Sequence, residues 1–252
     1  MFERKKIQVP WEGRVEPFRI IGNVYFAGTF QASCHLIDTG EGLILVDPGY
    51  AETLYLVIRS IYKLGFQPED IRYILATHWH RDHTEATRQL VDLSGAKTLI
   101  GQNDVEKARR FFEPDILIRD GDTLTLGNTT LSFLETPGHT RGTISFFFRT
   151  EENGKTYRVG MFGGAGANTL ATGHFDYEGC REDYRASLER LRGEQVDVFI
   201  GNHVWNNDTV TKGKILAETG ENRFIDGTLW RRFLDYCEKR LDELIKKEAQ
   251  AE

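Results

Sequence analysis

The sequence predicts an α+β domain in which two β-sheets pack face to face, and three observations lead to this fold class. The chain has 252 residues, 40% of them hydrophobic and 28% charged, which is ordinary for one large globular domain. Short β-rich runs recur at intervals of about ten residues, separated by Gly and Asp, and in the first half they alternate with helical patterns. Histidines follow three separate strands, and the simplest arrangement gathers them at one edge of a two-sheet sandwich.

We expect residues 1–252 to form a single domain, with an N-terminal extension over 1–14 and a solvated tail over 246–252. The sequence contains no internal repeat, no low-complexity segment and no linker rich in Pro, Gly or Ser that would divide it.

The first strands are short, and the last of them ends in an acid. The predicted strands are 15–21, 23–28, 32–37 and 42–49, which suggest an antiparallel meander. Asp47 ends the last of them before a Pro-Gly turn, where it could support a metal ligand from outside the coordination sphere. His35 lies inside a strand and is interpreted as structural. A helix over 54–62, closed by Gly65, then leads to a buried strand over 71–76.

The motif that follows this strand carries most of the functional information. Thr77 to His83 reads Thr-His-Trp-His-Arg-Asp-His, so that three of the seven histidines and one carboxylate lie close together. In a loop that leaves a strand, His78 and His80 can point the same way, while Asp82 and His83 face a second point nearby. Neutral imidazoles and a carboxylate suit zinc. The spacing therefore favours two metals over a set of solvated helix-cap residues.

Two later histidines also follow strands. A strand over 97–101 and a helix over 103–112, capped by Asn103, precede strands at 115–118, 122–126 and 130–134. His139 follows Pro137-Gly138 after the last of these. Two strands flank the hairpin turn Asn153-Gly154, and the second runs into the glycine-rich segment 163–168, which lacks phosphate-binding features and is interpreted as a close-approach loop. After a helix over 184–191, the strand 196–203 ends in His203, and an amphipathic helix begins at Gly227.

Composition excludes several classes of partner. The net charge of −6 and the absence of a basic arm argue against nucleic acid, and the apolar runs are far shorter than the roughly 20 residues that cross a bilayer. Three cysteines without paired spacing suit a reducing compartment. Met1–Lys6 is charged and precedes no apolar signal core. We therefore expect a small-molecule substrate and a cytoplasmic protein, or a periplasmic or secreted one if its N-terminus was trimmed; the oligomeric state is left open.

The pattern His-x-His-x-Asp-His resembles the signature of the metallo-β-lactamase fold superfamily, and the resemblance spans nearly the whole chain. It implies a four-layer αβ/βα sandwich, with two mixed sheets and helices on both outer faces. It also implies two Zn²⁺ ions per chain. One would be bound by His78, His80 and His139 and the other by Asp82, His83 and His203, with Asp82 also catalytic.

Within the superfamily the chain looks most like the subclass B3 metallo-β-lactamases, because the second triad is Asp-His-His. Many hydrolases of the fold place a bridging Asp at the strand end that here reads Phe162-Gly163, and no acid is present. B3 enzymes usually hold the substrate carboxylate with serines in the next loop. Here Gly164 and Gly166 are the corresponding candidates for substrate binding, and they offer only backbone N–H groups.

The resemblance implies a zinc hydrolase that opens a cyclic amide, such as a β-lactam, by attack of a zinc-bound hydroxide. The alternative is a lactone or thioester hydrolase of the same fold acting on a substrate other than a β-lactam. A di-iron redox protein and a non-catalytic metal-binding protein are less favoured: the first usually has a bridging acid and partner domains, and the second needs no open ligand position.

Overall fold

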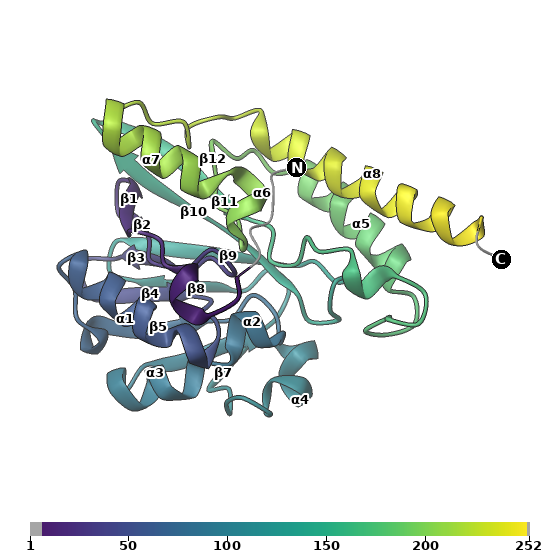
Figure 1. Ribbon diagram of the computed structural model, residues 1–252, viewed down its shortest axis with the longest axis horizontal. Coiled ribbons are helices and arrows are strands. Elements are labelled where there is room, and N and C mark those ends of the chain that lie inside the picture. Colours follow the sequence, from purple (N-terminus) through teal and green to yellow (C-terminus); the bar gives the residue numbers. More distant parts are fainter. Residues whose placement is uncertain (1–6, 251–252) are drawn as a thin grey trace.

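The computed structural model describes residues 7–250, and its strands form two sheets packed face to face (Figure 1). The first sheet has seven strands that lie side by side in the order of the chain. They pair antiparallel from β1 to β4 and parallel from β4 to β7. These strands are β1 Phe18–Ile21, β2 Val24–Phe26, β3 His35–Asp38, β4 Leu43–Val46, β5 Ile71–Leu75, β6 Lys97–Gly101 and β7 Ile116–Ile118.

The second sheet has five strands in the order β12-β11-β10-β9-β8. All its pairs are antiparallel except β11 with β12. The predicted hairpin at Asn153-Gly154 is confirmed, and both residues have positive φ, 52° and 73°, as this tight turn requires. The strands are β8 Thr123–Leu126, β9 Thr129–Glu135, β10 Ile144–Glu152, β11 Lys155–Met161 and β12 Val198–Phe199.

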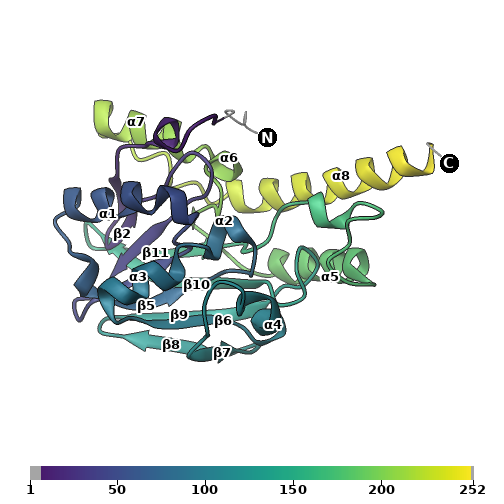
Figure 2. The ribbon, with the colours of Figure 1, turned by 60° about the horizontal axis from the view of Figure 1, so that its bottom comes forward.

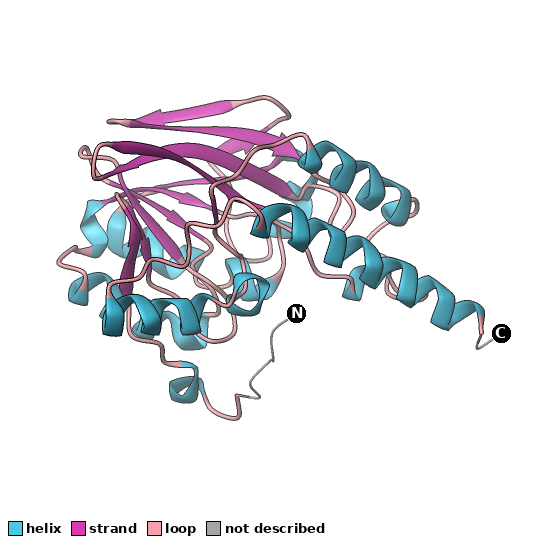
Figure 3. Ribbon diagram, turned by 90° about the horizontal axis from the view of Figure 1, so that it is seen from above, coloured by secondary structure: helices cyan, strands magenta, loops and turns pink. Residues whose placement is uncertain are grey.

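Helices cover both outer faces, as the view from above shows (Figure 3). On the first sheet, α1 and α3 bury Leu54, Val57 and Leu90 in one cluster with β3, β4 and β5. On the second, α5 and α8 lie side by side (Figure 2) and pack on β10 and β12. The α-helices are α1 Leu54–Lys63, α2 Arg81–Thr84, α3 Thr87–Ser94, α4 Val105–Ala108, α5 Cys180–Arg192, α6 Val204–Asn207, α7 Thr209–Thr219 and α8 Leu229–Ala249. Short 3₁₀ helices are η1 Pro10–Gly13, η2 Ala51–Thr53, η3 Pro68–Asp70, η4 Gln102–Asp104 and η5 Asn168–Leu170.

The main core lies between the sheets. Val46 and Leu75 of the first sheet belong to one buried cluster with Phe146 and Met161 of the second. The strand β4 is buried at every position, because helices cover one of its faces and the second sheet covers the other, so its sequence is continuously apolar. The predicted four-layer sandwich is confirmed.

Three predicted segments differ from the structure. The helix expected over 103–112 is divided into η4 and α4, and Asn103 lies within η4 rather than at a cap. The predicted strand over 196–203 is reduced to β12. The part of the predicted solvated tail from 246 to 249 belongs to α8, and Glu248 there accepts hydrogen bonds from Thr172.

The predicted N-terminal extension is also attached to the fold where it is described. Residues 10–13 form η1, and the backbone N–H of Phe30 donates to the carbonyl of Gly13. The charged segment Met1–Lys6, on which the prediction about a signal peptide depends, lies outside the described residues, as do 251–252. Among the helices of residues 7–250, none has the length and apolar character needed to cross a membrane.

Candidate metal centre

Three loops at one edge of the sandwich carry the predicted ligands. The loop after β5 carries His78 and His80 and continues into α2, whose first turn carries Asp82 and His83. His139 lies between β9 and β10, and His203 directly precedes α6. Because the strand ends lie at the same edge, residues more than a hundred positions apart come together.

The structure brings all six predicted ligands together in two groups. One contains His78, His80 and His139, and the other contains Asp82, His83 and His203. Within each group, one potential ligand atom of each residue lies within 4.8 Å of the others. These are the two triads that the resemblance implied.

Asp47 orients His83 directly and His78 through the Thr77 hydroxyl, on the side of each ring that faces away from the centre. Its carboxylate is fully buried and accepts hydrogen bonds from the Thr77 backbone N–H and hydroxyl, both at 2.8 Å. The ring Nδ1 of His83 lies 2.9 Å from the same carboxylate. Since the Thr77 hydroxyl donates to Asp47, it accepts from Nδ1 of His78, 3.0 Å away. Both imidazoles therefore have their Nε2 atoms free to face the centre, which is the supporting role predicted for Asp47.

Backbone carbonyls orient two further ligands in the same way. Nδ1 of His139 lies 2.8 Å from the carbonyl oxygen of Gly166, and Nδ1 of His203 lies 2.7 Å from that of Gln31. A hydrogen bond on one ring nitrogen leaves the other as the available lone pair. Four of the five imidazoles thus direct Nε2 toward the centre of the cluster.

The unused nitrogen atoms fit a metal ion. Nε2 of His78 and Nε2 of His83 are buried without a hydrogen-bond partner. Nδ1 of His80 lies 2.9 Å from Nε2 of His139, and the Asp82 carboxylate lies 3.4 Å from Nε2 of His83. A buried polar atom without a partner costs about 1–3 kcal/mol. Metal ligation would remove this cost at both Nε2 atoms, so the residues present suit the predicted ions.

The electrostatics of the two triads differ. Burial lowers the pKa of His80 to about 3 and that of His139 to about 4, and it also holds the pKa of His78 well below its usual value. These three rings are therefore neutral near pH 7, the form that binds a metal. At the other triad, burial lowers the pKa of His83, but the charges of Asp82 and Asp47 outweigh burial and raise it to about 10.

The glycine loop packs closely against the candidate metal centre. A Cβ atom at Gly164 would lie 2.7 Å from Oγ1 of Thr143 and 2.8 Å from Cβ of His139, and Gly164 does not line the cavity. The absence of a side chain at Gly164 lets the loop pack against His139, and substrate binding by its backbone N–H stays a prediction. Gly166 does line the cavity, and its carbonyl holds His139. The interpretation as a close-approach loop is confirmed.

Sequence reasoning missed Asp104. This carboxylate is buried and accepts hydrogen bonds from the Trp79 N–H at 3.0 Å, the Thr140 hydroxyl at 2.7 Å and the Gly142 N–H at 2.7 Å. It thereby ties the loop of His78 and His80 to the loop of His139. The available signal was its position just after β6, the same kind of strand-end position that drew attention to Asp47. His35, by contrast, is buried against the carbonyl of Gly201, 3.0 Å away, as its structural interpretation predicted.

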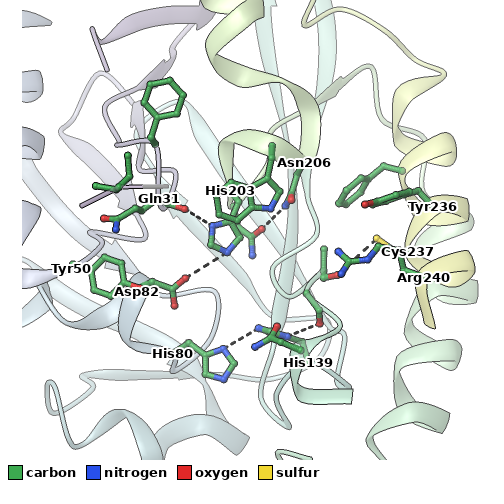
Figure 4. A pocket seen from close by; sticks show the side chains of 18 residues that line it. Gln31, Tyr50, His80, Asp82, His139, His203, Asn206, Tyr236, Cys237 and Arg240 are labelled. Carbon is green, nitrogen blue, oxygen red and sulfur yellow. Dashed lines mark hydrogen bonds and ion pairs between the residues drawn. The ribbon is translucent and has the colours of Figure 1, made fainter. Parts of the chain in front are cut away.

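A cavity of about 360 Å³ opens over the two triads. His80, Asp82, His139 and His203 line it, and Figure 4 shows them around one space with side chains of α8 across from them. Aromatic side chains form much of the remaining wall: Phe30, Tyr50, Trp205, Phe233 and Tyr236. A cavity with an apolar wall and converging polar groups is typical of a small-molecule site.

Solved structures share this architecture over almost the full chain. A subclass B3 metallo-beta-lactamase of Bradyrhizobium japonicum superposes with a TM-score of 0.88 and 28% identity, covering 96% of this chain and 98% of that one. A class B3 di-zinc metallo-beta-lactamase from an Alaskan soil metagenome gives a TM-score of 0.82 and 28% identity, covering 97% and 99%.

Curated relatives include hydrolases named for other substrates. A lactamase-like protein of Emericella nidulans is 33% identical over 142 residues, or 55% of this chain and 40% of that protein. A hydroxyacylglutathione hydrolase of Hyphomonas neptunium is 26% identical over 62% of this chain and 58% of its own length. An N-acyl homoserine lactonase of a Bacillus species is 27% identical over 68% of this chain and 80% of its own length. The chain thus spans about half the length of the first two.

The family model described as the metallo-beta-lactamase superfamily matches residues 27–203, from the end of β2 to the last predicted ligand. This stretch covers more than half of the chain and contains both triads. With the two-sheet fold and the paired ligand groups, the match establishes the family: the chain belongs to the metallo-β-lactamase superfamily.

Proposed function

We propose that the chain is a dizinc hydrolase that opens a cyclic amide, with β-lactams as the first substrate class to test. The observation that carries the proposal is the convergence of two ligand triads, with unpartnered Nε2 atoms, on one cavity. The likeness to subclass B3 enzymes along nearly the whole chain supports it.

The residues at the cavity would have three roles: metal binding, orientation of the nucleophile and exclusion of water. His78, His80 and His139 would hold one ion, and Asp82, His83 and His203 the other. When bound, the ions polarise the scissile carbonyl and supply a hydroxide near neutral pH, because zinc lowers the pKa of water to about 7. Asp82 lines the cavity beside both groups and would orient the nucleophile and accept its proton. The aromatic wall would exclude water from the reacting bond.

A lactone or thioester is the second candidate class. Gly164 and Gly166 supply no hydroxyl where the resemblance leads us to expect serines that hold a β-lactam carboxylate, and Gly164 has no room for one. The lactonase and the hydroxyacylglutathione hydrolase among the relatives support this candidate.

A di-iron centre is disfavoured by a steric observation. The resemblance associates that chemistry with a bridging acid at the strand end occupied here by Gly163. A Cβ atom at Gly163 would lie 2.0 Å from the carbonyl oxygen of Ile144, so no side chain fits there without moving β10.

The test is a substrate panel with controlled metal content. Chromogenic β-lactams, lactones and thioesters are assayed with the zinc-loaded protein, after removal of metal with a chelator, and after zinc is restored. We expect hydrolysis of at least one cyclic substrate that disappears with the metal and returns with zinc. Hydrolysis unaffected by chelation, or no hydrolysis of any of the three classes by protein holding two zinc ions, would overturn the proposal.

A further inference from the structure

We infer that Arg240 binds a carboxylate of the substrate, so that the enzyme prefers anionic substrates; this inference rests on the proposed function. The argument begins with α8. Its residues Phe233, Tyr236, Cys237 and Arg240 are spaced by three and four positions, so they lie on one face of the helix. All four line the cavity over the metal centre, and Figure 4 shows Arg240 across that cavity from Asp82.

Arg240 is the cation that a substrate would meet there. Apart from histidines, the charged residues that line the cavity, among those described, are Asp82 and Arg240. Asp82 belongs to the second triad, so its charge would be used by a metal ion. The remaining lining residues are aromatic, aliphatic, amide or thiol in character, and they offer an anion no other full positive charge.

Among residues 7–250, the guanidinium of Arg240 has no acidic partner. Acidic side chains of α8 pair with arginines of α5: Asp235 and Glu238 with Arg192, Asp242 with Arg185, and Glu248 with Arg181. Arg240 has no such ion pair within residues 7–250; its recorded contact is the ring of Tyr236, whose centroid lies 5.8 Å from Cζ. A planar guanidinium with free N–H groups matches a carboxylate in a bidentate arrangement.

The position of Arg240 would compensate for the lack of hydroxyl groups in the glycine loop. The loop supplies no hydroxyl to hold an anion, and Gly164 is closed to side chains. The charge that would hold the substrate comes instead from the opposite wall of the cavity, on α8. A ring whose scissile carbonyl lies at the two triads would then extend its carboxylate toward Arg240.

The experiment tests recognition of the substrate carboxylate independently of the hydrolysis step. Ring-opened benzylpenicillin carries the carboxylate formed by hydrolysis and a second, original carboxylate, whereas its methyl ester retains only the first. Binding of both compounds to the zinc-loaded protein is measured by calorimetry for wild type, Arg240→Gln and Arg240→Lys. Arg231→Gln is the matched control, because Arg231 is also an exposed residue of α8 without an ion pair among the described residues, but it does not line this cavity.

We expect the free acid to bind wild type about 10- to 100-fold more tightly than the ester, the effect of a hydrogen bond to a charged group. Arg240→Gln should abolish this preference, Arg240→Lys should retain part of it, and Arg231→Gln should leave it intact. In hydrolysis of intact benzylpenicillin or of a carboxylated lactone, Arg240→Gln should raise KM about tenfold or more with kcat changed less than about threefold, and neutral esters should be unaffected.

The possible outcomes distinguish the two proposals. If wild type binds acid and ester equally, or if Arg240→Gln weakens both equally, Arg240 does not recognise the anion, although the hydrolase assignment can stand. If the zinc-loaded protein hydrolyses no β-lactam, lactone or thioester while the binding preference depends on Arg240, the proposed reaction fails and the anion site remains.

Discussion

Replacement of Asp104 by asparagine tests whether the metal centre depends on a carboxylate that touches none of the six ligands. Asp104 accepts hydrogen bonds from the Trp79 and Gly142 N–H groups, one on each oxygen, and from the Thr140 hydroxyl. Asparagine keeps one acceptor oxygen but places an NH₂ group on the other side. At least one backbone N–H then faces another donor in a buried site.

The unpaired N–H group determines the expected loss of stability. A buried donor left without a partner costs about 1–3 kcal/mol, so the free energy of unfolding should fall by this amount. The two loops that Asp104 joins carry His78, His80 and His139. Zinc affinity at this triad should therefore fall about 10- to 100-fold, the usual effect of losing a group that supports metal ligands. Affinity at the triad of Asp82 should change less.

The assay combines urea unfolding with zinc titration against a chromophoric chelator. Asp115→Asn is the matched control: Asp115 also accepts a backbone N–H and a hydroxyl, both from Thr98 at 2.8 Å, but it is exposed and far in sequence from the ligand loops. Water can replace its lost hydrogen bond, so we expect a loss of less than about 1 kcal/mol and unchanged zinc binding. Equal zinc affinities for Asp104→Asn and wild type would refute the reasoning.

Four further predictions concern the same centre. Elemental analysis should find close to two zinc ions per chain, with His139→Ala and His203→Ala each losing mainly one; one ion at saturating zinc, unchanged by His203→Ala, would contradict the two triads. Asp82→Asn should reduce kcat about a thousandfold, because nucleophile alignment is worth several kcal/mol, while its unfolding curve stays close to wild type; near-normal turnover with full metal would disprove its role. Gly164→Ser should lower stability and zinc content rather than improve β-lactam binding, because its Cβ would meet His139 at 2.8 Å, and a folded variant with two zinc ions and lower KM would reverse this conclusion. Burial raises the pKa of Asp104 to about 6 in the metal-free protein, so the folded state binds this proton more tightly than the unfolded chain does. Wild type should therefore lose about 2 kcal/mol of unfolding free energy relative to Asp104→Asn as pH rises from about 4 to 6.5. Parallel pH profiles would show that Asp104 is not the group responsible.

Local sequence was sufficient to locate most of the centre. His78, His80, Asp82 and His83 lie within six positions, and a strand-to-loop junction places such neighbours together whatever the rest of the chain does. His139 and His203 could be added because each follows a strand, and the carboxyl ends of neighbouring strands meet at a common edge. The supporting position of Asp47 was found by the same rule.

The sandwich, the two triads and the hairpin at Asn153-Gly154 follow from patterns that act over a few residues: strand periodicity, turn chemistry and ligand spacing. Contacts between side chains that are far apart in the sequence do not follow from such local patterns. Gly164 packs against His139, and Asp104 joins the two loops that carry predicted ligands. Arg240 reaches the cavity from the last helix because α8 packs with α5 on the second sheet. These contacts depend on the packing of whole elements, which no local pattern records. The residues that would hold the metals can thus be inferred from the sequence, whereas those that would select the substrate emerge only when the elements are packed.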